Sequence, residues 1–162
     1  DEKDAKLFYP AVLQFVGYQS RGEDFAIFEV VTSKVWPVIP LGTEHSEVVP
    51  ASFWNIASPL GLGIQIFEGN ISSLDLDRPL KEGDINWQHS LVLQMAGVNG
   101  GSSGSALISK TQHSIVGFLV GIVGGSTIVA IPVSRFKQAR AAFAAKKYRW
   151  YVPVETLDLS VQ

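Results

Sequence analysis

Residues 98–108 read VNGGSSGSALI, and this glycine- and serine-rich stretch decides the fold. The apolar run SLVLQM at 90–95 precedes it, and the apolar run IVGFLVG at 115–121 follows it. Short apolar runs bounded by turn residues are typical of β-strands, so the stretch is expected to be a loop between two strands. Ser103 lies inside this loop, where neighbouring glycines permit a sharp turn that exposes its hydroxyl.

Two interpretations of this loop stay open on its own residues. The first is a flexible hairpin loop, which glycine and serine between strands commonly form. The second is a nucleophile loop for acyl transfer, because an exposed serine hydroxyl beside convergent backbone N–H groups supplies both a nucleophile and an oxyanion site. The rest of the chain decides between them.

Composition restricts the class of protein. The chain has 162 residues, 46% of them apolar, which is enough for one domain with a sizeable core. The net charge of −2 gives no electrostatic reason to expect nucleic acid or an anionic membrane as a partner, and no apolar run is long enough to span a bilayer. The lack of cysteine excludes disulfides, thiol nucleophiles and zinc–cysteine sites, and it leaves the localisation open between cytoplasm and periplasm.

Short apolar runs separated by turn residues recur along the chain and predict an all-β fold, a Greek-key barrel or sandwich. The expected strands cover residues 7–16, 25–31, 52–57, 64–71, 90–95, 105–109, 114–121 and 126–131. An extended surface segment with two prolines is expected at 35–41, and a charged, turn-rich loop is expected at 74–86. One helix is expected from an N-cap at Ser134, with an apolar stripe of Phe136, Ala139, Ala142 and Phe143.

A series of segments carries a family resemblance. In chain order they are EDFAIFEV at 23–30, VIPLG at 38–42, WNIASPLGLG at 54–63, VNGGSSGSAL at 98–107, IVGF at 115–118 and VAIP at 129–132. Together they resemble the chymotrypsin-fold, trypsin-like serine proteases, most closely the HtrA/Deg branch. They look like the triad-aspartate segment, the crossover between two barrels with the start of the second, the nucleophile loop, and the strands that flank the substrate pocket.

The resemblance implies an all-β, chymotrypsin-like double β-barrel with a C-terminal helix. Residues 1–42 would be the C-terminal part of the first barrel, which is therefore partial, and would carry the triad aspartate. Residues 43–133 would form the complete second barrel with the nucleophile loop, and residues 134–162 would form the helix and the tail.

The resemblance also implies roles for single residues. Ser103 would be the nucleophile, the N–H groups of Gly101 and Ser103 would form the oxyanion hole, and Asp24 would orient the catalytic histidine. The remaining positions would bind substrate: an extended peptide would add as a strand along Leu119, Val120 and Gly121, and Ile128 would stand in the wall of the specificity pocket.

Two neighbouring serines compete with Ser103 for the role of nucleophile. The family pattern places the nucleophile two residues after the oxyanion glycine and directly before another glycine, which selects Ser103 over Ser102 and Ser105. Ser105 replaces a glycine that is common in the family, although Gly-x-Ser-Gly-Ser versions are familiar. The Gly-x-Ser-x-Gly elbow of α/β-hydrolases does not fit, because position 105 is not glycine.

The general base is the missing part of the triad. The family pattern places a histidine before the aspartate, and residues 1–23 contain none. The three histidines, His45, His89 and His113, all follow Asp24 and are expected to be solvated surface side chains. We therefore expect the histidine on an upstream segment of a longer protein or on a separate chain after cleavage, unless the domain is a non-catalytic relative.

The leading hypothesis is a serine endopeptidase that cleaves polypeptides through an acyl-enzyme and needs no metal or cofactor. The predicted pocket wall, at 95–101, 119–121 and 126–130, contains no charged residue, which favours a small or medium apolar side chain at the P1 position of the substrate. The alternative is a non-catalytic, protease-fold module that binds peptides or a protein partner, and a purely structural β-domain is the third interpretation. The oligomeric state stays open.

Overall fold

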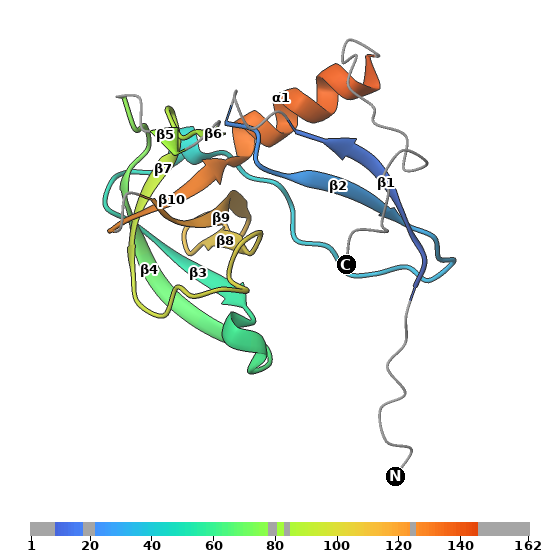
Figure 1. The fold of residues 1–162 in the computed structure, drawn as a ribbon, viewed down its shortest axis with the longest axis horizontal. Coiled ribbons are helices and arrows are strands. Elements are labelled where there is room, and N and C mark those ends of the chain that lie inside the picture. The colour runs from blue at the N-terminus through green and yellow to red at the C-terminus, as the bar shows by residue number, and fades with distance from the viewer. Residues whose placement is uncertain (1–8, 18–21, 78–80, 83–84, 124–125, 146–162) are drawn as a thin grey trace.

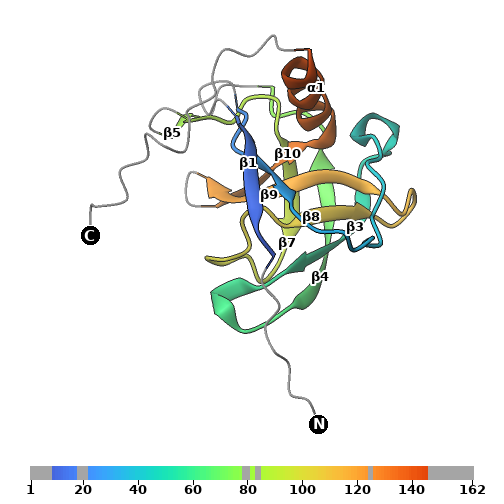
Figure 2. The ribbon, with the colours of Figure 1, turned by 90° about the vertical axis from the view of Figure 1, so that its right-hand side faces the viewer.

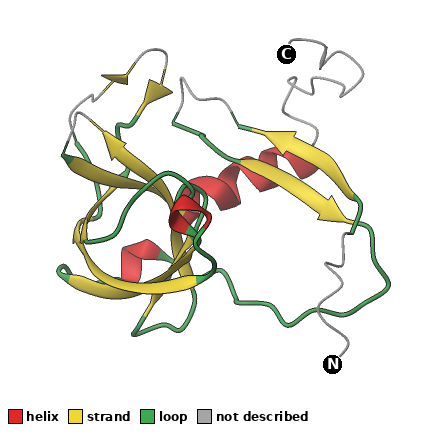
Figure 3. Cartoon of the chain, turned by 60° about the horizontal axis from the view of Figure 1, so that its bottom comes forward, coloured by secondary structure: helices red, strands yellow, loops and turns green. Residues whose placement is uncertain are grey.

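The structure, a computed structural model, describes residues 9–17, 22–77, 81–82, 85–123 and 126–145. A closed β-barrel forms its larger part, and a β-hairpin lies beside the barrel (Figure 1). Helix α1 leads away from the barrel on the side of the hairpin (Figure 1), and in the perpendicular view the hairpin lies in front of the barrel with α1 above (Figure 2). A long extended connection joins the hairpin to the barrel (Figure 3). The expected all-β architecture with one C-terminal helix is therefore confirmed.

The described elements follow the predicted order closely. They are β1 (Ala11–Val16), β2 (Ala26–Val30), the 3₁₀ turn η2 (Glu44–Ser46), β3 (Ala51–Ala57), the 3₁₀ turn η3 (Pro59–Gly61), β4 (Gln65–Ser73), β5 (Lys81–Glu82), β6 (Ile85–Asn86), β7 (Leu91–Met95), β8 (Ala106–Ser109), β9 (Ile115–Val123), β10 (Thr127–Pro132) and α1 (Val133–Ala144). The stretch 74–86 differs from the expected loop, because the short strands β5 and β6 pair within it.

The barrel closes in the strand order β10-β7-β4-β3-β8-β9, and every pair of neighbours is antiparallel. Alternate residues of a strand point to opposite faces, so one set from each strand fills the interior. The side chains of Phe53, Leu91, Leu107 and Val116 are completely inaccessible there. This closed barrel is the complete second barrel that the sequence predicts, and it presents the loop at 96–105 as the connection between β7 and β8.

The hairpin β1–β2 represents the partial first barrel. Its pairing runs from Ala11 opposite Val30 to Val16 opposite Ala26. A row of aromatic rings joins it to the rest of the molecule: Phe15 stacks on Phe25 at 5.7 Å, Phe25 contacts Phe136 of α1 at 5.4 Å, and Phe136 contacts Phe118 of β9 at 5.2 Å between ring centroids.

Helix α1 begins at Val133, two residues before the first helical position that an N-cap at Ser134 predicts, and its N-terminus is satisfied differently. Ser134 lies inside the helix, so its predicted role as N-cap is wrong. The Ser134 N–H instead donates to Oε2 of Glu44 at 3.2 Å. A carboxylate at this end also suits the helix dipole. Glu44 lies 90 residues away in the sequence, so no local pattern could have indicated it.

The connection between hairpin and barrel is extended and largely exposed, as expected for residues 35–41; the side chain of Val35 is 92% exposed and that of Val38 is 84% exposed. Its C-terminal end is anchored to the barrel and to α1. Lys137 of α1 donates to the carbonyl of Gly42, and the side chain of Gln112 bonds both backbone groups of Thr43. The connection is therefore exposed around Val35 and Val38 and is fixed to the barrel and to α1 at Gly42 and Thr43.

Candidate active site

Ser103 is an exposed residue of the β7–β8 loop and contacts strand β9. Its Oγ donates a hydrogen bond of 2.5 Å to the carbonyl of Val120. The following residues bind the same strand: the N–H of Gly104 donates to the Leu119 carbonyl at 2.7 Å, and the Leu119 N–H donates to the Ser105 carbonyl at 2.8 Å. These bonds fix the C-terminal half of the loop to β9.

The N-terminal half of the loop is held by turn η3. The N–H of Leu60 donates to the carbonyl of Gly100 at 2.8 Å. Gly101 has φ of +92°, and a Cβ at this position would lie 2.7 Å from the carbonyl oxygen of Ser58. Both the dihedral and the close approach require glycine.

The hydroxyls of the two rival serines, Ser102 and Ser105, are hydrogen-bonded inside the loop and to the barrel. Ser102 is 2% exposed, and its Oγ accepts from the N–H of Asn99 at 3.3 Å. Ser105 is half-buried; its Oγ donates to the Ser102 carbonyl at 2.6 Å and accepts from Nδ2 of Asn55 at 2.8 Å. Ser103 is thus the serine of this loop whose side chain is exposed.

Asp24 lies just before β2, at the edge of a cavity of about 190 Å³ between hairpin and barrel. The same cavity is lined by Gly104, the neighbour of Ser103, and by Leu119. Aromatic side chains from the hairpin, from β9 and from α1 complete its wall; they are Phe25, Phe118 and Phe136. The structure thus brings the predicted aspartate and the predicted nucleophile loop to one cavity, although they lie far apart in the sequence.

The predicted substrate-binding residues fall into two groups. Leu119, Val120 and Gly121 run along β9 beside the serine, and a Cβ on Gly121 would lie 4.0 Å from Ser103 Oγ. The N–H of Leu119 already donates to the carbonyl of Ser105 in the serine loop, so it is not available to a substrate strand. Ile128 pairs with Leu93 and Ile122, and its half-buried side chain packs on the barrel core, as do Met95 and Val98.

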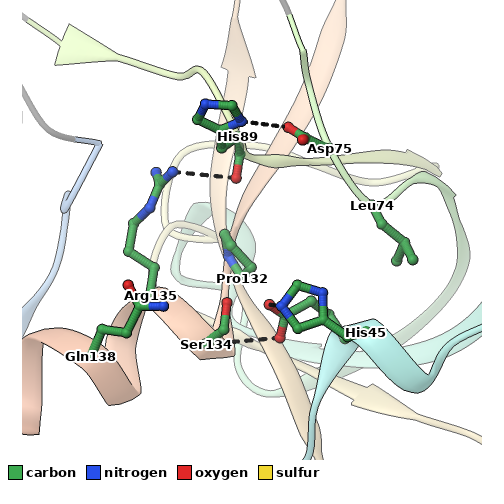
Figure 4. Close-up of a pocket in the computed structure, with 9 residues that line it drawn as sticks. His45, Leu74, Asp75, His89, Pro132, Ser134, Arg135 and Gln138 are labelled. Atoms are coloured by element: carbon green, nitrogen blue, oxygen red, sulfur yellow. Dashed lines mark hydrogen bonds and ion pairs between the residues drawn. The ribbon is translucent and has the colours of Figure 1, made fainter.

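The three histidines lie elsewhere, and all three are exposed as expected. None of them is among the residues that line the Asp24 cavity. His113 lies in the turn between β8 and β9. His45 and His89 border a second, polar cavity of about 350 Å³ near the start of α1 (Figure 4). Within the described ranges, no histidine therefore lies at the Asp24 cavity where it could act as the general base.

The second cavity pairs each of its histidines with a carboxylate. His89 Nδ1 lies 2.8 Å from Oδ1 of Asp75, and the two side chains point toward one another in Figure 4. His45 Nε2 lies 3.4 Å from Oε1 of the buried Glu44. These residues come from separate stretches of sequence, so sequence reasoning found no motif here. No three His, Asp or Glu side chains in the described part of the chain group as a metal site.

Arg135 closes one side of this second cavity. Its guanidinium donates to the carbonyls of Gly22 and Gln88, each at 3.0 Å, and to that of His89 at 3.4 Å. Burial lowers the pKa of the guanidinium, and the carboxylates of Glu23, Asp75 and Glu44 oppose that shift. Since the ordinary pKa of arginine is very high, the side chain stays charged and donates hydrogen bonds to these carbonyls.

Comparison with known proteins gives the family. The family model described as a trypsin-like peptidase domain matches residues 3–122, which include Asp24 and the whole serine loop. None of the curated proteins searched matches the sequence significantly. No helix in the described ranges is long and apolar enough to cross a membrane.

Among solved structures, the HtrA-type protease AlgW with a decapeptide superposes with a TM-score of 0.66 at 20% sequence identity. The match covers 85% of this chain and 41% of that protein, so the chain spans less than half of its length. At this identity the likeness establishes the fold, and the family model establishes the kinship. The chain belongs to the trypsin-like peptidase domain family and has the chymotrypsin-like fold of an HtrA-type protease.

Proposed function

We propose that this chain carries the nucleophile and the aspartate of a serine endopeptidase. The observation that supports it most is the state of Ser103: its hydroxyl is exposed, while the loop around it is hydrogen-bonded to β9 on one side and to η3 on the other. A nucleophile needs this combination, because it must reach substrate from a backbone that does not move during the reaction.

In the proposed reaction, Ser103 Oγ attacks the scissile carbonyl carbon and passes its proton to a histidine base. The carbonyl oxygen becomes an oxyanion, which accepts hydrogen bonds from the N–H groups of Gly101 and Ser103. Among the described residues, no protein acceptor receives a hydrogen bond from either N–H. Each such donor is typically worth about 10²–10³-fold in rate. The peptide C–N bond then breaks, the histidine protonates the leaving amine, and water hydrolyses the acyl-enzyme.

Asp24 is assigned to orient the histidine and to stabilise its imidazolium form. Its support is the shared cavity with Gly104 and Leu119. The proposal takes the histidine from an upstream segment outside this sequence, because residues 1–23 contain none.

A polypeptide is the proposed substrate. Val120 and Gly121 would pair with it as an added strand, which is the manner in which extended peptides bind exposed strand edges. The half-buried Met95, Val98 and Ile128 favour a small or medium apolar P1 side chain. A panel of peptides that vary only at P1 tests this, and faster cleavage after lysine or arginine would contradict it.

The function is tested with a fluorophosphonate probe on the natural full-length protein, with the labelled residue mapped by mass spectrometry. Labelling at Ser103 that disappears on denaturation and in Ser103→Ala supports the proposal. A protein that carries its histidine and is still not labelled would contradict it and favour the alternative, a non-catalytic module that binds peptides or protein partners. Unchanged peptide binding by Ser103→Ala would then be expected.

A further inference from the structure

The two N–H groups of the proposed oxyanion hole belong to two peptide groups, Gly100–Gly101 and Ser102–Ser103. In a trans peptide the N–H and the C=O point in opposite directions. A hydrogen bond that fixes the carbonyl of a peptide group therefore also fixes the direction of the N–H of the same group. The carbonyl of Gly100 accepts a hydrogen bond from a backbone group, the N–H of Leu60, whereas that of Ser102 accepts one from a side-chain hydroxyl in addition to a backbone N–H.

The Ser102 carbonyl accepts two hydrogen bonds from Ser105, one from Oγ at 2.6 Å and one from the N–H at 3.2 Å. The Ser105 hydroxyl is itself held by Nδ2 of Asn55, which donates to Oγ at 2.8 Å and to the carbonyl of Ala106 at 3.0 Å. A carbonyl only accepts, so the nitrogen of the Asn55 amide must face Ala106. This fixes the amide orientation and makes Ser105 Oγ a donor toward Ser102.

Asn55 is an unusual residue for its place. It is completely buried in β3, where the other inward-facing residues are Ala51, Phe53 and Ala57. No donor among the described residues reaches its Oδ1. A buried amide oxygen without a partner is costly, and an aliphatic side chain would avoid that cost. A role in packing alone therefore does not account for asparagine at this position.

We propose that Asn55 and Ser105 are positioning residues that together aim the Ser103 N–H into the oxyanion site. The chain of bonds runs from Asn55 on the closed barrel, through the Ser105 hydroxyl, to the Ser102 carbonyl. These bonds connect the Ser102–Ser103 peptide group to β3 and so restrict its rotation. This inference rests on the proposed function. It assigns to Ser105 a positioning role, whereas the role of nucleophile belongs to Ser103.

The kinetic test compares Ser105→Ala with Ser105→Thr in the natural full-length protein. Ser105→Ala should lower kcat about 10-fold or more with little change in KM, because the oxyanion exists only after binding. Ser105→Thr keeps a hydroxyl and should recover most of the rate. Asn55→Leu should lower kcat in the same way, and the double variant Asn55→Leu/Ser105→Ala should be no slower than Ser105→Ala alone, since both act on one peptide group.

Ser109→Ala is the matched control, at the other end of β8. Its Oγ accepts from the N–H groups of Thr111 and Gln112 in the β8–β9 turn. This variant should lose stability in thermal unfolding and keep the kcat of the parent. A fall in kcat for Ser109→Ala equal to that of Ser105→Ala would overturn the inference, because it would show that any lost serine hydroxyl has this effect.

A structural measurement separates this inference from the proposed function. Crystal structures of the parent and of Ser105→Ala should show the Ser102–Ser103 peptide rotated or split between two orientations in the variant only. If the parent is never acylated at Ser103, the proposed function fails, but the crystal structures still test the positioning role. An unrotated Ser102–Ser103 peptide in Ser105→Ala would overturn the inference whether or not the parent is an active enzyme.

Discussion

Gly101 combines two demands that a larger residue cannot meet, a positive φ and a close approach to the Ser58 carbonyl. We predict that Gly101→Ala lowers kcat/KM at least about 10-fold, because the shifted turn carries the Gly101 N–H away from the oxyanion. Gly100→Ala is the control, since its Cβ would meet nothing within 4 Å. The rates of fluorophosphonate labelling of the two variants decide the matter, and equal rates would remove Gly101 from the site.

Leu60 is a leucine in the left-handed region, with φ of 55° and a side chain that is 65% exposed. That conformation costs a non-glycine residue about 1–2 kcal/mol, and part of this is offset by the entropy that glycine loses on folding. Leu60→Gly should therefore stabilise the fold by about 0.5 kcal/mol. Leu62, with φ of −77°, is the matched control. Leu62→Gly should destabilise the fold in urea unfolding, and a change of the same sign in both variants would contradict this.

At the residue scale, the sequence predicts the serine loop and the aspartate of the proposed site, but it does not indicate the contacts that hold the serine loop in place. The motif at 98–108 and the segment at 23–30 are local patterns, and each carries its own signal. Asn55 reaches Ser105 across 50 residues, and Leu60 contributes only a backbone N–H. Contacts of both kinds are created by tertiary structure, so nothing in the sequence near either residue indicates them.

At the scale of elements, helix α1 joins parts of the chain that are distant in sequence, and Arg135 is its main polar contact. The guanidinium bonds the carbonyls of Gly22, Gln88 and His89. Arg135→Met should destabilise the fold by about 2–3 kcal/mol, since hydrogen bonds to a charged group are worth more than neutral ones. The exposed Arg140 of the same helix is the control. Denaturant unfolding checks the pair, and similar midpoints would show that Arg135 is dispensable.

On the outer surface of the barrel, Glu68 of β4 makes an ion pair with Lys110, the residue that follows β8, and accepts a hydrogen bond from Trp54 of β3. Hydrogen bonds from Lys110 and from Trp54, with the charge of Lys110, lower the pKa of the Glu68 carboxyl. A lowered native pKa stabilises the fold above the unfolded pKa, and this contribution is lost as pH falls through the native value. Lys110→Met should raise the pKa of Glu68 toward its ordinary value in an NMR titration. An unmoved titration would show that the lysine does not act on Glu68.

The elements themselves were largely predictable, for a physical reason. A barrel strand is short, apolar on its inward positions and bounded by turns, and each of these properties is visible in the sequence. The start of α1 was predicted two residues late, because the group that satisfies its N-terminus is the distant Glu44 and not a neighbouring side chain. Within 74–86, the two-residue strands β5 and β6 are too short to leave a pattern.

At the scale of the whole molecule, the row of aromatic rings holds the hairpin against the barrel. Phe136 lies at its centre and contacts both Phe25 and Phe118. Phe136→Ala should cost about 2 kcal/mol, less than a fully buried phenylalanine, and should speed amide exchange in β1 and β2 more than in the barrel. Phe28→Ala, at a side chain that is 58% exposed, should have little effect. Uniformly faster exchange throughout the chain would contradict this division.

Barrel closure was expected from the family resemblance and not from composition, which could not distinguish a barrel from a sandwich. The closed barrel and the two-stranded hairpin agree with the fold that the resemblance implies. The division into residues 1–42, 43–133 and 134–162 stays a prediction, and residues 146–162 lie outside the described part of the chain.

The exposed connection between β2 and the barrel has a consequence for protein engineering. Residues 31–40 are extended, and Val35 and Val38 project almost fully into solvent. A cut at this point would divide the chain into a piece with Asp24 and a piece with Ser103, and it would sever no strand of the barrel. Each piece could be fused to one of two proteins of interest. If the piece with Asp24 also carries the upstream histidine that the proposed function requires, reassembly would restore the proposed active site, and cleavage of a fluorogenic peptide would report that the two proteins have met.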